Sequence, residues 1–116
     1  MAKSTRSSSG YSFDSNSGGL VYATKTIDNT DSPYTVLAGD VVILCDCTAG
    51  AITVNMPALT SLGRVITVKK IDVSANFVTI DGDGAETIDG DATPDLTAQY
   101  QVKAMLDGSA TDWSVI

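Results

Sequence analysis

The chain has 116 residues with 14 acidic and 7 basic side chains and no histidine, so its formal net charge is −7 at pH 7. This length suits one domain that buries a core without disulfides or metals, and the acidic balance disfavours nucleic acid, because phosphate binding relies on clustered lysine and arginine. A chain without histidine has no Ser-His-Asp or Cys-His nucleophile system and no histidine-based metal site. We therefore expect no enzyme activity, no cofactor, no metal and no nucleic-acid partner.

Residues 1–19 are rich in Ser and Gly and carry Lys3 and Arg6 against Asp14, whereas residues 20–116 carry five basic and thirteen acidic side chains. Ordering such a segment costs roughly 1–2 kcal/mol per residue, and burying Tyr11 and Phe13 returns only roughly 1.5–3 kcal/mol each. This N-terminal arm is therefore either a solvated tail or is held by a partner, for instance by strand addition. The candidates for partner contact are Lys3, Arg6, Tyr11 and Phe13.

Residues 20–116 read as a single β-domain. Fourteen Thr, eleven Val and eight Ile stand against one Glu in the chain, and this composition favours strands over helices. The sequence predicts an all-β fold of short antiparallel strands in a sandwich, a barrel or a β-prism-like domain, with an extended N-terminal arm. Residues 20–26 are the first strand, expected at a sheet edge or between subunits. Residues 1–19 lack the apolar core of a signal peptide and no apolar run approaches the roughly 20 residues of a membrane helix, so we expect no membrane partner and synthesis in the cytoplasm.

The run from Val41 to Cys45 is apolar on both faces of a strand. In a small domain, a strand covered on both sides lies in a sandwich interior, in a barrel wall or at a subunit contact. Val41, Ile43 and Cys45 are therefore the candidates for a subunit interface. Cys45 and Cys47 lie two residues apart with parallel Cβ directions, which disfavours a disulfide, and no further Cys or His completes a zinc shell. We expect buried free thiols.

Further strands follow along the chain. Alternation over residues 51–56 points Ile52, Val54 and Met56 inward. Residues 65–71 and 77–80 predict an antiparallel hairpin around the break at residues 74–76. Residues 98–106 place Tyr100, Val102, Ala104 and Leu106 on one face, and the chain ends on an apolar strand at residues 113–116.

Three Asp-Gly pairs, at residues 81–82, 83–84 and 89–90, predict tight turns. Asp81 and Asp83 have roughly the carboxylate spacing that glycosidases use, but solvated corners beside glycine lack the apolar setting of a general acid. The start of the segment also resembles a calcium loop, although Ala85 stands where a third oxygen ligand belongs. Turn formation is the favoured interpretation of this acidic cluster, which comprises Asp81, Asp83, Glu86, Asp89 and Asp91.

The order of motifs over residues 34–116 resembles a module widespread in tailed-phage tail fibres, head fibres and capsid decoration proteins. The paired corners Thr79-Ile80-Asp81-Gly82 and Thr87-Ile88-Asp89-Gly90 are its most specific part. The other segments that carry the resemblance are Tyr34-Thr35-Val36, Asp40 with Ile43 and Asp46, Gly50-Ala51-Ile52-Thr53-Val54, Met56-Pro57, Gly63-Arg64, Val68-Lys69-Lys70 with Asp72, Ser74 and Asn76, Tyr100, and Trp113-Ser114-Val115-Ile116. Such modules are all-β and usually trimeric, and they occur on virion exteriors without catalytic residues.

The resemblance implies a virion structural protein made in the host cytoplasm. Fibre versions of the module typically end much longer chains, whereas a short arm precedes it here, so we expect a capsid decoration or cement protein on the outer surface of the head. Its arm would grip the major capsid protein, and the chain would form a homotrimer. The alternative is a receptor-binding or attachment module of a phage tail or head fibre.

Overall fold

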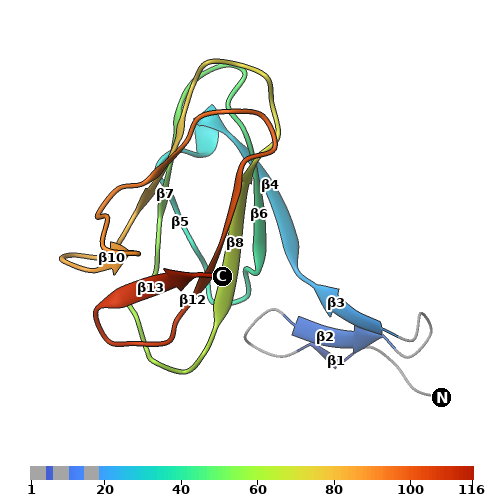
Figure 1. Ribbon diagram of the computed structural model, residues 1–116. Coiled ribbons are helices and arrows are strands. Elements are labelled where there is room, and N and C mark those ends of the chain that lie inside the picture. Colours follow the sequence, from blue (N-terminus) through green and yellow to red (C-terminus); the bar gives the residue numbers. More distant parts are fainter. Residues whose placement is uncertain (1–4, 7–10, 15–18) are drawn as a thin grey trace.

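The computed structural model describes residues 5–6, 11–14 and 19–116, and strands dominate this part of the chain (Figure 1). Two mixed sheets form the body, one in the order β10-β13-β12-β8-β6-β4 and the other in the order β11-β9-β7-β5. The elements of the body are β4 (Thr24–Asp28), the 3-10 turn η1 (Asn29–Asp31), β5 (Tyr34–Thr35), β6 (Val42–Asp46), β7 (Ile52–Asn55), β8 (Val65–Lys70), β9 (Val78–Asp81), β10 (Thr87–Ile88), β11 (Asp95–Leu96), β12 (Val102–Leu106) and β13 (Asp112–Val115). The expected all-β class is confirmed, and the arrangement is a sandwich.

Strand direction differs from the expectation. The chain alternates between the sheets, so that β4, β6 and β8 are parallel neighbours in the six-stranded sheet. The strands that follow each of them, β5, β7 and β9, are parallel neighbours in the four-stranded sheet. The later strands β11 and β12 run antiparallel on β9 and β8, and β13 runs antiparallel on β12. The prediction of antiparallel strands is therefore wrong for β4 to β9. After each crossing the chain returns to the sheet it left, and the new strand points the same way as its neighbour there.

The predicted hairpin of residues 65–71 and 77–80 is also wrong. β8 pairs with β6 and β12, whereas β9 pairs with β7 and β11 in the opposite sheet. Ile66 and Val68 from β8 and Val78 and Ile80 from β9 are all buried and belong to one core cluster. Each of the two runs has an apolar face. These faces are buried more completely when the runs lie opposite each other across the sandwich than when they pair side by side.

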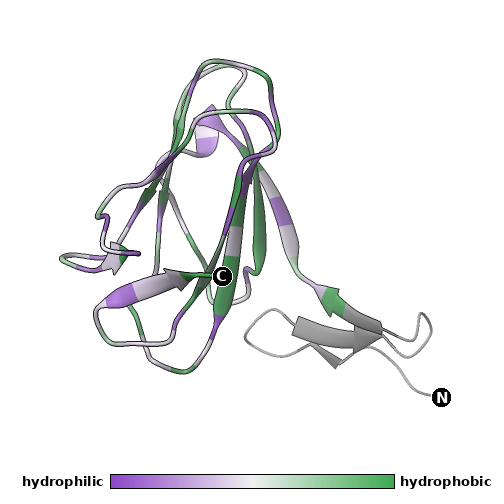
Figure 2. Cartoon of the chain, in the orientation of Figure 1, coloured by the Kyte–Doolittle hydropathy of each residue, from purple (hydrophilic) through white to green (hydrophobic). Residues whose placement is uncertain are grey.

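The core lies between the sheets and is built from alternate residues of the strands. Figure 2 shows that hydrophobic residues recur along the strands of both sheets. Ile52, Val54 and Met56 point into it as expected, and the C-terminal strand adds the fully buried Trp113. Cys45 and Cys47 are free and buried, which confirms the expected thiols. Loss of water around Cys45 raises the pKa of its thiol to about 12, so this thiol stays protonated at neutral pH.

A buried carboxylate ties the loops together at each end of the sandwich. At one end Asp72 accepts hydrogen bonds from the Lys70 ammonium at 2.7 Å and from the backbone N–H of Cys47 at 2.7 Å. At the other end Asp107 accepts from the backbone N–H groups of Thr60 at 3.0 Å and Ser61 at 2.7 Å. These bonds satisfy polar groups that would otherwise be buried without partners, and they hold the crossings between the two sheets in place.

The N-terminal arm forms a separate antiparallel sheet of β1 (Thr5–Arg6), β2 (Tyr11–Asp14) and β3 (Gly19–Tyr22). In Figure 1 this sheet extends away from the body. Only Ala23 separates β3 from β4, and β4 is the outermost strand of the six-stranded sheet. The prediction of an edge strand near residues 20–26 is thus confirmed for Thr24–Asp28, and the arm leaves the body from that edge.

Candidate functional site

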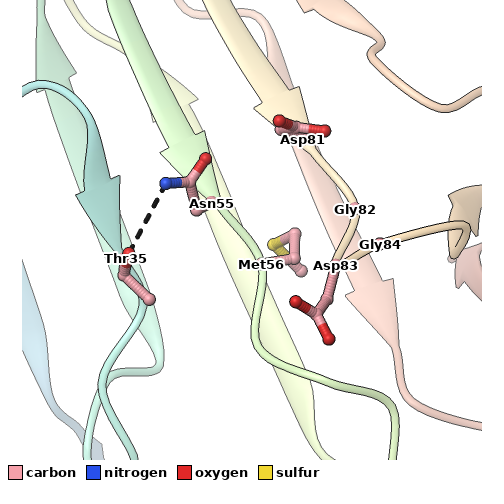
Figure 3. Close-up of a pocket in the computed structure, with 7 residues that line it drawn as sticks. All are labelled: Thr35, Asn55, Met56, Asp81, Gly82, Asp83 and Gly84. Carbon is pink, nitrogen blue, oxygen red and sulfur yellow. Dashed lines mark hydrogen bonds between the residues drawn. The ribbon is translucent and has the colours of Figure 1, made fainter.

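A row of polar side chains crosses the outer face of the four-stranded sheet (Figure 3). Thr35, Asn55 and Asp81 are aligned on the parallel neighbours β5, β7 and β9. The Asn55 side-chain N–H donates to the Thr35 hydroxyl at 3.5 Å. With Met56 and residues 82–84, these side chains line a hollow of about 260 Å³. The register of three parallel strands therefore collects a hydroxyl, an amide and a carboxylate in one place.

Glycine shapes the rim of this hollow. A Cβ atom at Gly82 would lie 2.1 Å from the backbone oxygen of Glu86, so the chain closes here only without a side chain. Gly84 has a φ of +56°, in the left-handed region that favours glycine. The predicted tight turn is confirmed at Asp83-Gly84, where the Glu86 N–H donates to the Asp83 carbonyl at 3.0 Å. The turn predicted at Asp81-Gly82 is wrong, because Asp81 belongs to β9. The turn at Gly84 holds Asp83 beside the hollow that Asp81 also lines.

The other carboxylates of the acidic cluster accept backbone hydrogen bonds, and two of these come from segments far away in the chain. Glu86 accepts from the backbone N–H of Leu59 at 3.0 Å, Asp89 from that of Val115 at 3.0 Å, and Asp91 from that of Thr93 at 3.0 Å. Among the residues that the structure describes, no three His, Cys, Asp or Glu side chains come close enough together to hold a metal ion. These three carboxylates therefore act at turns and strand ends, as the favoured interpretation of the sequence had it.

The structure describes only some of the arm residues that were predicted to contact a partner. Lys3 lies outside the described residues. Arg6 lies in β1, and Tyr11 and Phe13 lie in β2, but their side chains are likewise outside the described part. Their role in binding stays a prediction.

The predicted subunit interface lies inside the molecule. Val41 is 2% exposed, and Ile43 and Cys45 are fully buried between the sheets. Side chains enclosed in this way cannot contact a second subunit, so the choice of these three residues is corrected. The other face of the same strand, with Val42 and Leu44, is the one that points outward.

The outer face of the six-stranded sheet is apolar, in contrast to the row in Figure 3. Leu44 on β6 and Val102 on β12 flank Lys69 on β8, and Val42 and Ala104 flank Thr67 in the next row. Val102 is 52% exposed and the terminal Ile116 is 70% exposed. We call this surface the apolar outer face; its members are Val42, Leu44, Val65, Val102, Ala104, Leu106 and Ile116.

The sequence analysis did not predict the apolar outer face, although the sequence contains a signal for it. The run from Val41 to Cys45 is apolar at every position, which indicates that both sides of the strand are covered. Alternation also places Val102, Ala104 and Leu106 together on one face of their strand. Which of the two sides belongs to the core depends on the neighbouring sheet. That choice cannot be made from alternation alone.

The chain matches no protein-family model and no curated protein sequence. In the described part of the chain, no helix is long and apolar enough to cross a membrane.

Proposed function

We propose that this chain is a structural protein of a tailed-phage particle, a decoration or cement protein on the outside of the capsid. Its N-terminal arm binds the major capsid protein, its β-domain faces outward, and its copies associate as a homotrimer. The observation that carries the proposal is the separation of the arm from the body: β1, β2 and β3 form a sheet of their own that extends beyond the core (Figure 1).

A projecting sheet of three short strands suits an anchor. Three strands need an apolar face covered by something else to be stable, and a partner surface supplies that cover when the arm binds. The arm also differs from the body in charge, since Lys3 and Arg6 outnumber Asp14 while residues 20–116 are strongly acidic. A basic arm on an acidic body favours binding through the arm to an acidic surface, with the body held away from it.

Co-sedimentation with capsids tests this function. The capsids are assembled from the major capsid protein of the phage that encodes the chain and lack any decoration protein. We expect the full chain to sediment with them, and we expect binding to be lost on deletion of residues 1–19 and weakened in a Lys3→Glu/Arg6→Glu variant. Lys25→Glu, a charge change of the same kind on the body, is the matched control and should bind normally. Binding that survives deletion of the arm would overturn the anchor.

The hollow of Thr35, Asn55, Asp81 and Asp83 favours a second candidate, an attachment module of a fibre. Carboxylate, amide and hydroxyl groups on an open sheet face can hydrogen-bond the hydroxyls of a host glycan. For this function we expect binding to host cells that survives removal of the arm and falls in an Asn55→Ala/Asp81→Ala variant. Capsid binding without cell binding would exclude it.

A further inference from the structure

The apolar outer face is an unusual surface for a sheet exposed to water. A sheet with one face on the core normally carries polar side chains on the other, and the four-stranded sheet of this molecule does so with Thr53, Asn55 and Thr79. The six-stranded sheet instead presents aliphatic side chains on adjacent strands, among them Val102 at 52% and Ile116 at 70% exposure. Lys69 and Thr67 of β8 lie between the aliphatic residues of β6 and those of β12. An apolar patch of a few hundred Å² on the surface of a single chain is often a functional contact surface.

The distribution of charged side chains indicates which partner covers the apolar outer face. Residues 20–116 carry five basic and thirteen acidic side chains, so two bodies repel each other over most of their surfaces. The two central rows of the apolar outer face hold Lys69 and Thr67 among aliphatic residues, and Asp46 lies on the same side of β6 at its end. A second copy of the chain therefore meets this face without acidic repulsion at its centre, and it brings an Asp46 that can lie against Lys69.

The area of the apolar outer face and its closeness to the arm also favour a second copy of the chain as the partner. The face spans β6, β8, β12 and β13, and strands about 4.8 Å apart with about 3.3 Å per residue give it roughly 300 Å². That area matches the apolar centre of an interface of about 800 Å² per partner, with the remainder supplied by a polar rim. The arm leaves from β4, the edge of this same sheet, with Val21 and Tyr22 exposed, so it lies where it can add to that rim.

We propose that the apolar outer face of the six-stranded sheet is the surface through which copies of this chain associate. Leu44 and Val102 lie on either side of Lys69, and Lys69 is the charged residue that the partner's carboxylate neutralises. This contact extends the proposed function, which calls for a homotrimer. Its test uses purified protein alone: a single-chain result would remove the homotrimer, whereas the capsid anchor would still be tested separately by co-sedimentation.

Leu44→Glu is the decisive variant. Leu44 is the cross-strand neighbour of Lys69, so a glutamate there gains an opposite charge within its own sheet and the single subunit keeps its fold. The same carboxylate at the centre of an apolar contact must be taken out of water on association. We expect the dissociation constant for self-association to rise by on the order of 100-fold or more. Val102→Glu, at a half-exposed position that is also paired with Lys69, should act in the same way and is the second variant.

Analytical ultracentrifugation of the full chain at micromolar concentration measures the outcome. The wild type should sediment as a multiple of 12.0 kDa and both glutamate variants as single chains. Thr53→Glu makes the same change on the outer face of β7, an inner strand of the other sheet, and should sediment like the wild type. A wild type of single-chain mass, or unchanged assembly in both variants, would overturn the proposal. Loss of assembly in Thr53→Glu as well would place the contact elsewhere and also overturn it.

Discussion

The two sheets enclose one core but present opposite outer faces to their surroundings. On the four-stranded sheet the outward positions carry Thr35, Thr53, Asn55, Thr79 and Asp81. On the six-stranded sheet Val42, Leu44, Val102, Ala104 and Leu106 share the outer face with Thr67 and Lys69, and the edge strand β4 adds Thr24 and Thr26. The inward positions of both sheets are alike, with Ile and Val predominating. The comparison shows that the core accounts for one side of each strand only. The polar face suits contact with water, and the apolar face is the one that we propose a second copy of the chain covers.

The greatest loss of unfolding free energy is expected from a change in the loop between β8 and β9, which carries the chain from one sheet to the other. Asp72→Ala leaves the fully buried Lys70 ammonium without its carboxylate and frees the Cys47 N–H. Removing one member of a buried ion pair costs about 3–5 kcal/mol of unfolding free energy. Urea unfolding at one protein concentration, followed by fluorescence of the buried Trp113, measures the loss.

Asp95→Ala is the control for that variant. Asp95 also accepts a hydrogen bond, from the Thr79 hydroxyl at 2.7 Å, but on the exposed polar face. We expect a loss of less than about 1 kcal/mol there. Equal losses for the two variants would show that Asp72 does not hold the crossing.

Ile43 and Leu44 are adjacent residues of β6 whose side chains point to opposite sides of the sheet, so they test the two sides separately. Ile43 is fully buried, so Ile43→Ala should lower the free energy of unfolding by about 2–5 kcal/mol through the cavity it leaves. Leu44 points to the apolar outer face, and Leu44→Ala should change the unfolding free energy of a separated subunit by about 1 kcal/mol or less.

Concentration dependence separates the two effects. Unfolding of an associated protein shifts with protein concentration, so Leu44→Ala should weaken that shift and Ile43→Ala should leave it in place. The measurement is a set of urea curves over a range of concentrations. The same concentration dependence in the wild type and Leu44→Ala would contradict the assignment of this side of the strand to a contact.

The smallest effect is a dependence on pH at the same crossing. Burial raises the pKa of Asp72, but hydrogen bonds from Lys70, Ser74 and the N–H of Cys47 outweigh it and hold this pKa well below its ordinary value. Because the folded state has the lower pKa, the stabilising contribution is fully present above about pH 4 and is lost as the pH falls further.

Asp72→Asn tests this sign. The difference in unfolding free energy between the wild type and Asp72→Asn should be constant from neutral pH to about pH 4 and should shrink below it. A difference that stays constant down to the lowest pH at which both proteins fold would contradict the lowered pKa.

Much of the local structure follows from the residues themselves. β-Branched runs with period-two alternation predicted the strands, and Asp-Gly pairs predicted turns such as Asp89-Gly90, where both residues have positive φ. The inward direction of Ile52, Val54 and Met56 followed from alternation beside Pro57. These features depend on backbone sterics and on neighbours in the chain, which the sequence contains directly.

Pairing partners and the side of each strand that meets the core were decided by the tertiary structure. β8 and β9 are neighbours in sequence, and alternation alone is compatible with their lying side by side or across the sandwich. The buried network of Lys70, Asp72 and Cys47 holds the second arrangement, and it joins residues up to 25 positions apart. The residue pattern alone predicts that the run from Val41 to Cys45 is apolar on both of its sides. Only packing against the opposite sheet decided that Ile43 is core and Leu44 is surface, because burial depends on contacts between residues far apart in the chain.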